Sequence, residues 1–209
     1  PLAWSFPVYH SYKEEADPVN VVVVQPNIDP YAERYDQQAE NEKLQKFVRL
    51  AESQTTDQTD LVIGPETVFE RYPEWREDQL PLNYQFRELA GWMSRYSNAE
   101  VIFGASTSKI YPGPGEATAT ARSRNGVVYD VFNSAVFIGR QGKEQIYHKS
   151  LLVVGVEKMP FMKYLGFLRD IVFDLGGTTG SLGRQDEPSN FELKDGSLVA
   201  PVICYESVF

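Results

Sequence analysis

The order of apolar and amphipathic segments in the first half of the chain most constrains its fold. Residues 19–24 form an almost continuous apolar run, which is typical of a strand buried on both faces. Residues 36–53 predict an amphipathic helix, residues 61–63 a second buried strand, and residues 101–105 a third strand after another amphipathic helix. The apolar stripes of the two helices consist of Leu44, Phe47, Val48 and Ala51, and of Leu82, Phe86, Leu89, Ala90 and Met93.

The second half begins with strands that no helix separates. After a loop at residues 111–115, the pattern predicts strands at about 126–129, 133–138 and 144–147, with a hairpin turn at 139–143. A β-α-β-α-β unit followed by such a meander predicts a mixed sheet with helices on one face. The fold class is therefore α/β.

Composition agrees with one globular domain. Hydrophobic residues make up 42% of the 209 residues and charged residues 23%, which are ordinary values. The net charge is −9 and lysine and arginine do not cluster, so nucleic acid is not an expected partner. The sequence has no apolar run of about 18 residues, and its first residues do not form a signal-peptide pattern.

Cys204 is the only cysteine, so it cannot form an internal disulfide. A lone cysteine is either a small buried hydrophobe or a nucleophile. It follows the apolar run 197–203, which predicts a strand, and polar residues come after it. A thiol in this place is held on a rigid support beside a potential site.

Two more reactive groups follow predicted strands. Glu66 comes directly after the break Gly64-Pro65, and Lys149 follows the strand at 144–147. Singly, Glu66 is explained as a helix cap and Lys149 as a solvated strand-end charge. Together with Cys204 they supply a general base, a cation and a nucleophile, the set that acyl transfer through a thioester requires.

The residues around these groups resemble the nitrilase superfamily and, within it, the apolipoprotein N-acyltransferase family. The resemblance runs from about residue 19 to the end and depends on the order and spacing of several motifs. They are Val24-Gln25-Pro26-Asn27-Ile28, Gly64-Pro65-Glu66, Phe132-Asn133-Ser134, Tyr147-His148-Lys149-Ser150-Leu151-Leu152-Val153, Glu157-Lys158-Met159-Pro160-Phe161 and Ile203-Cys204-Tyr205-Glu206. The resemblance implies a nitrilase-like α-β-β-α sandwich, here incomplete at its carboxyl end.

The resemblance also implies roles for individual residues. Glu66, Lys149 and Cys204 are the expected catalytic triad. The expected supporting residues are Glu157, Tyr205 and Glu206, and the expected substrate contacts are Tyr35, Phe161 and Leu165. The loop after the lysine commonly reads Val-Pro-Phe-Gly-Glu in the family and here reads Val-Val-Gly-Val-Glu, with the glutamate still eight residues after the lysine.

Residues 1–18 are expected to be a connector from a preceding membrane region, and residues 19–209 the catalytic domain. An apolar insertion at about 150–188 predicts a lid. Its residues 158–173 carry three basic side chains against one acidic side chain, and basic charge beside apolar bulk suits an anionic membrane surface. A core helix under a loop remains the alternative for this segment.

The resemblance implies transfer of a fatty acyl chain from a phospholipid to a diacylglyceryl apolipoprotein, at the periplasmic side of a bacterial inner membrane. No metal and no cofactor is expected. Two alternatives stay open: a soluble nitrilase-type amidase with water as acceptor, and a non-catalytic domain that kept the fold.

Overall fold

A computed structural model describes residues 2–13, 18–28, 37–69, 74–113, 115–140, 143–155, 157–158 and 181–209. The helical elements are α1 (Leu2–Ser11), α2 (Gln37–Glu52), η1 (Glu77–Leu82), α3 (Tyr84–Met93) and η4 (Cys204–Val208), of which η1 and η4 are 3₁₀ helices. The strands are β1 (Val21–Val23), β2 (Leu61–Ile63), β3 (Trp75–Arg76), β4 (Glu100–Tyr111), β5 (Arg122–Arg124), β6 (Val127–Ile138), β7 (Glu144–His148), β8 (Phe191–Glu192) and β9 (Leu198–Val199).

Within these residues the strands form one mixed seven-stranded sheet in the order β1-β2-β4-β6-β5 and a separate pair, β8 and β9. Strands β1, β2 and β4 are parallel, while β4, β6 and β7 are antiparallel. Strand β3 pairs with β4 at Thr107 and Ser108, past the part of β4 that pairs with β2. Strand β7 pairs with the carboxyl-terminal half of β6, from Ser134 to Ile138. The mixed sheet predicted from the order of segments is confirmed.

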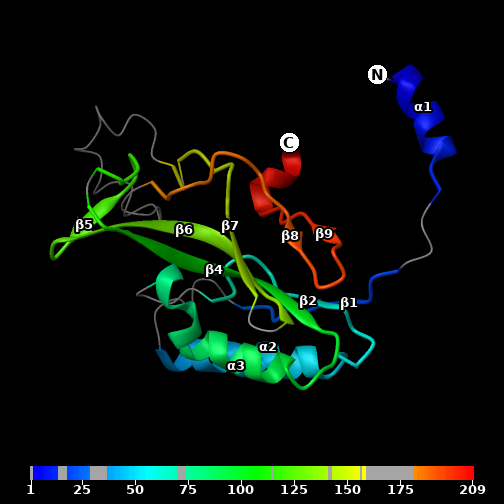
Figure 1. Ribbon diagram of the computed structural model, residues 1–209, viewed down its shortest axis with the longest axis horizontal. Coiled ribbons are helices and arrows are strands. Elements are labelled where there is room, and N and C mark those ends of the chain that lie inside the picture. Colours follow the sequence, from blue (N-terminus) through cyan, green and yellow to red (C-terminus); the bar gives the residue numbers. More distant parts are fainter. Residues whose placement is uncertain are drawn as a thin grey trace.

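The two faces of the sheet have different coverings. Helices α2 and α3 lie side by side on one face, and β8, β9 and η4 lie on the other (Figure 1). Alternate residues of β4 separate accordingly: Val101 and Phe103 join the helix-side core, and Ile102 joins the cluster with Phe137 and Ile203. Each large apolar side chain buried in this way contributes roughly 1.5–3 kcal/mol to folding.

The helical stripes read from the sequence face the core, with the exception of Leu82. Leu82 ends η1, before the Asn83 cap at which α3 begins, and is 72% exposed. Leu44, Phe47 and Ala51 of α2 are fully buried, and Leu89 of α3 is fully buried against the same cluster. The prediction of both helices on one face is therefore confirmed.

Several details differ from the predictions. The segments 126–129 and 133–138 belong to one long strand, β6, because its residues pair continuously with β4 from Val128 to Ile138. Of the apolar run 197–203, only Leu198–Val199 form a strand. It ends two residues before Pro201, which has no N–H to give to a ladder. Strands β3, β5 and β8 are too short to give a sequence pattern.

Residues 2–11 form α1, which sequence reasoning did not predict. Figure 1 shows α1 standing apart from the rest of the domain. Its side chains Trp4 and Tyr9 are each 79% exposed. Among the helices of the described residues, none is long and apolar enough to cross a membrane.

Candidate active site

Glu66 lies in a turn that crosses over strand β4. The chain leaves β2 at Gly64, whose N–H donates to Ile102 O at 2.7 Å, and the N–H of Gly104 then donates to Pro65 O at 3.0 Å. The crossing is so close that a Cβ on Gly104 would stand 2.3 Å from the backbone nitrogen of Thr67. Thr67 itself has a φ of 46°, in the left-handed region. The Gly-Pro break and the glycine beneath it together fix the position of Glu66.

Lys149 follows β7 directly and points to the face of the sheet that the helices leave open. Its side chain is 1% exposed, and its Nζ lies 3.3 Å from Glu66 Oε1 and 2.9 Å from Glu157 Oε1. Burial acts to lower the pKa of Lys149, but the hydrogen bond to Glu157 and the charges of Glu66 and Glu157 outweigh it, and the pKa is raised. The group is therefore an ammonium at neutral pH.

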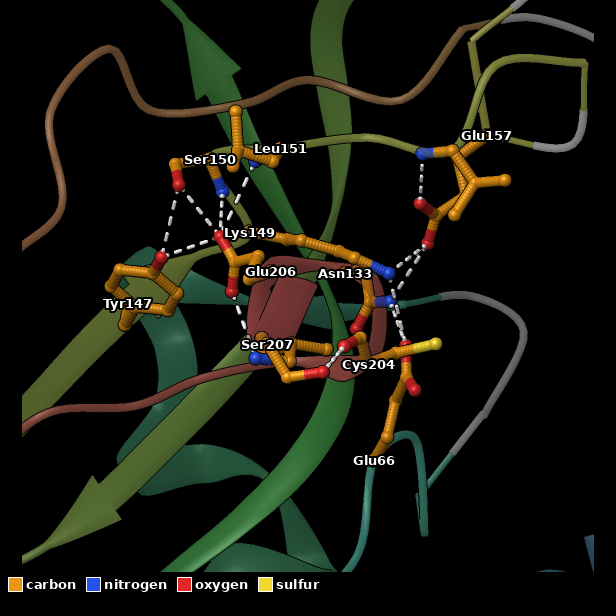
Figure 2. A network of polar contacts seen from close by, with 12 residues as sticks. Glu66, Asn133, Tyr147, Lys149, Ser150, Leu151, Glu157, Cys204, Glu206 and Ser207 are labelled. Atoms are coloured by element: carbon orange, nitrogen blue, oxygen red, sulfur yellow. Dashed lines mark hydrogen bonds and ion pairs between the residues drawn. The ribbon is translucent and has the colours of Figure 1, made fainter. Parts of the chain in front are cut away.

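Asn133 joins the same two carboxylates from the middle of β6. Its Nδ2 donates to Glu66 Oε1 at 2.7 Å and to Glu157 Oε1 at 3.0 Å (Figure 2). Its backbone oxygen accepts from the N–H of Lys149 at 2.9 Å. The amide and the ammonium thus hold Glu66 and Glu157 on one side of the site.

Glu157 is fixed by a tight loop of its own. Its Oε2 accepts from the N–H of Val153 at 2.8 Å, and its N–H donates to Val153 O at 3.0 Å. Gly155 within the loop has a φ of +92°, a conformation that favours glycine. The loop with the shifted glycine therefore still brings its glutamate to Lys149.

Cys204 opens the 3₁₀ helix η4 and is exposed. Its φ is 49°, a conformation that costs a residue with a side chain roughly 1–2 kcal/mol. The preceding residue, Ile203, is buried in the core, so the chain turns sharply where the thiol begins. Figure 2 shows the Cys204 side chain extending toward the Glu66 carboxylate and the Asn133 amide. Strained turns that expose a nucleophile are a recurring device of active sites.

Glu206 ties the Cys204 turn to the segment that carries Lys149. Its Oε1 accepts from Tyr147 Oη at 2.6 Å, from Ser150 N and Oγ at 2.7 and 2.6 Å, and from Leu151 N at 3.3 Å. Its Oε2 accepts from Ile203 N at 2.8 Å. The carboxylate is therefore a bridge between two chain segments more than 50 residues apart in sequence.

Ionisation in this bridge follows from burial and hydrogen bonding. Burial acts to raise the pKa of Glu206, but the hydrogen bonds from Ser150, Tyr147 and Ile203 outweigh it, and the pKa is lowered. The pKa of Tyr147 is raised by burial and by the Glu206 carboxylate, so its hydroxyl remains a donor.

The other residues expected at the site have different placements. Tyr205 is 40% exposed, and its ring packs edge-on against the ring of Phe209, with 5.2 Å between the ring centroids. Tyr35, Phe161 and Leu165 lie outside the described residues, as does most of the expected lid. Their roles remain predictions.

Sequence reasoning missed the functions of Asn133, Gly104, Tyr147 and Ser150. Asn133 stood in one of the motifs of the resemblance without an assigned role, and a polar residue at an inward strand position is a signal for a buried polar partner. Gly104 gave no sequence signal of its function, because a glycine in a strand has several explanations.

The arrangement has the chemistry of acyl transfer. It combines a carboxylate, an ammonium held between two carboxylates, and an exposed thiol on a strained turn. In the part of the chain that the structure describes, no group of three or more histidine, cysteine, aspartate or glutamate side chains is placed to hold a metal ion.

Comparisons with known proteins identify the family of the chain. The carbon-nitrogen hydrolase family profile matches residues 20–209. The chain is 30% identical over 197 residues to an apolipoprotein N-acyltransferase of Chlorobaculum tepidum, covering 91% of this chain and 36% of that protein. The chain therefore spans about a third of the length of this curated relative.

Two solved structures are similar at 18% identity. One is XC1258 of Xanthomonas campestris, described as a CN-hydrolase superfamily protein with an arsenic adduct in the active site; the match covers 81% of this chain and 49% of that one, with a TM-score of 0.47. The other is a glutamine-dependent NAD⁺ synthetase of Acinetobacter baumannii, with coverage of 74% and 23% and a TM-score of 0.36. Because the family profile spans nearly the whole sequence, this chain belongs to the carbon-nitrogen hydrolase family, with the nitrilase-like α/β fold that its motifs predicted.

Proposed function

We propose that this domain transfers a fatty acyl chain from a phospholipid to the amino-terminal lipidated cysteine of an apolipoprotein, through a thioester on Cys204. The observation that carries the proposal is the Lys149 ammonium, held between Glu66 and Glu157 on the side of the site toward which Cys204 extends. The similarity to an apolipoprotein N-acyltransferase supports the lipid donor and the lipoprotein acceptor.

In the first step Glu66 accepts the thiol proton of Cys204, and the sulfur attacks the carbonyl carbon of a phospholipid ester. The bond between that carbon and the ester oxygen breaks, and the leaving alcohol takes the proton from Glu66. Of the three N–H groups of Lys149, two face Glu66 and Glu157 in the described residues. The third is the donor for the oxyanion that forms on the carbonyl.

In the second step the α-amine of the acceptor attacks the thioester carbonyl. The carbon–sulfur bond breaks, an amide forms, and the amine proton returns through Glu66 to the sulfur. Glu157 helps to keep Lys149 charged, because its hydrogen bond and its charge raise the pKa of Lys149, and its carboxylate is held by Val153 and Asn133.

The proposal places the domain on the periplasmic side of a bacterial inner membrane, with a membrane surface as partner and without a cofactor. Residues 1–18 are then the connector from a membrane region, and the segment at about 150–188 is the lid that admits lipid. Basic and apolar side chains in that segment support this assignment.

Amide hydrolysis is the second candidate, since the family is that of carbon-nitrogen hydrolases. It uses the same residues and replaces the acceptor amine with water. The long apolar segment after Lys149 favours the acyltransferase, because small polar amides need no such surface.

One experiment separates these candidates. The full-length protein is incubated with phospholipid vesicles labelled in the acyl chain and a diacylglyceryl peptide with a free amino terminus, and in parallel with small amides. Labelled N-acyl peptide that is lost in Cys204→Ala supports the proposal. Ammonia from the amides without acyl peptide supports the amidase, and no reaction in either assay supports a non-catalytic domain.

A further inference from the structure

A polar cluster lies behind Lys149, on the helix-covered face of the sheet. Its members are Ser134, Thr107, Glu77 and His148, linked by hydrogen bonds in that order. Ser134 Oγ lies 2.7 Å from Thr107 Oγ1, Thr107 donates to Glu77 Oε1 at 2.9 Å, and His148 Nε2 lies 2.8 Å from the same Glu77 oxygen. None of these side chains reaches Cys204 or the carboxylates of the site, because alternate residues of a strand point to opposite faces.

His148 is the residue before Lys149 and the last residue of β7. Three contacts hold it. Its ring stacks on Phe132 with 3.9 Å between ring centroids and 16° between the ring planes, its backbone N–H donates to Gln185 Oε1 at 2.8 Å, and its Nε2 contacts Glu77. Since a carboxylate only accepts, Nε2 carries a proton and donates.

Glu77 is fixed at the other end of the contact. It begins η1, directly after β3, and β3 is paired with β4 at Thr107 and Ser108. The side chains of His148 and Glu77 are only 18% and 14% exposed. The bond therefore joins the end of β7 to a rigid part of the sheet, where water competes little.

We propose that His148 is a positioning residue, whose bond to Glu77 fixes Lys149 from the opposite face of the sheet. Lys149 must contact Glu66 and Glu157 at once, and a lysine side chain has many rotamers. Its backbone N–H is held within the sheet by Asn133 O, and the neighbouring His148 is held from the face opposite the site. The catalytic consequence rests on the proposed role of Lys149.

The test compares four variants of the full-length protein: His148→Leu, His148→Gln, Glu77→Leu and His10→Leu. Glutamine keeps an N–H donor at about the reach of Nε2, and leucine keeps none. His10 is the other histidine of the chain and is exposed on α1, so its replacement is the matched control. Acyl transfer is measured as kcat and KM, and Cys204 reactivity as the rate of alkylation by iodoacetamide, each per folded molecule.

We expect His148→Leu and Glu77→Leu to lower kcat about 10- to 100-fold, since small misplacements of catalytic groups have effects of this size. KM should stay within about twofold, because substrate is not contacted. Alkylation should slow, because the thiolate near Lys149 is the reactive form. His148→Gln should recover most of both rates, and His10→Leu should match the parent protein.

Unchanged kcat and alkylation in folded His148→Leu would overturn the inference. Equal losses in His148→Gln and His148→Leu, in proportion to the loss of folded protein, would also overturn it and leave a purely structural role. If the parent protein transfers no acyl chain, the proposed function fails by itself, and the alkylation rates still decide the role of His148.

Discussion

The Nζ atom of Lys149 lies 3.3 Å from Oε1 of Glu66, although the two residues are 83 positions apart in the sequence. Lys149 comes directly after the end of β7, and Glu66 comes shortly after the end of β2. The sheet brings the two side chains together on the same face. A base and a cation in contact serve a nucleophile best when neither can move away. The hydrogen bonds of Asn133 and Glu157 provide that restraint.

Replacing Lys149 by methionine removes the cation and leaves two carboxylates facing each other. Loss of an electrostatic donor of this kind lowers kcat about 10²- to 10³-fold or more. Breaking a buried ion pair costs about 3–5 kcal/mol, and the partial exposure of Glu66 (34%) places the expected cost near the lower value. Turnover and denaturant unfolding measure the two effects.

Lys143→Met is the matched control for this substitution. Lys143 forms a surface ion pair with Glu192, and its side chain is 45% exposed. We expect a change in the free energy of unfolding below about 1 kcal/mol and full activity. Equal effects of the two substitutions would show that Lys149 contributes no more to stability and activity than a surface lysine does.

Gly104→Ala should displace Glu66. The added Cβ would stand 2.3 Å from Thr67 N and 2.7 Å from the Cα of Glu66, so the turn above β4 must shift. Overpacking of this kind costs roughly 1–3 kcal/mol, and the loss of activity should exceed what unfolding explains. Melting temperature and turnover are the measurements.

Gly91→Ala provides the comparison, because nothing lies within 4 Å of its added Cβ in α3. Alanine inside a helix should stabilise the protein by roughly 0.5–1 kcal/mol and leave activity unchanged. A Gly104→Ala protein with normal turnover would refute the assignment of this glycine to the Glu66 turn.

Glu206→Gln should weaken the dependence of stability on acid pH. The pKa of Glu206 is lower in the folded protein than its ordinary value of 4.5, so its stabilising effect is present above that value. This stabilisation is lost as the pH falls below 4.5 and then through the lower pKa of Glu206 in the folded protein. Glutamine cannot titrate, and its NH₂ group faces a backbone donor, so it should also cost about 1–3 kcal/mol at neutral pH.

The measurement is the free energy of urea unfolding between about pH 3 and 7, for the parent protein, Glu206→Gln and Glu192→Gln. Glu192 is a surface residue, 58% exposed in its side chain, and serves as the control. Acid slopes that are identical in the parent protein and Glu206→Gln would mean that the bridge contributes nothing through its charge.

Much of this architecture follows from sequence pattern. Helical stripes predicted α2 and α3, and apolar runs predicted the parallel strands, because burial on one or both faces leaves a clear period. Glu66 and Lys149 stood out because each comes within three residues of the end of a predicted strand.

The contacts that complete the site leave no such signal. Asn133 lies in the middle of β6, and its pairing with Glu66 depends on the register of β6 against β4 and β7. The Glu206 bridge joins segments that only the folded sheet brings together. The strand predicted at 197–203 forms only at Leu198–Val199, since Pro201 within the apolar run has no N–H to give to a ladder.

Mass spectrometry of the intact full-length protein, incubated with phospholipid vesicles and no acceptor, tests the central claim most directly. The account predicts an added mass of one acyl chain, located on Cys204 by peptide mapping, sensitive to hydroxylamine, and lost when the acceptor peptide is added. Cys204→Ser should carry little or none and transfer little, because a hydroxyl is far less ionised than a thiol. Transfer at the parent rate by Cys204→Ala, or an acyl chain found on another residue of an active protein, would contradict the account.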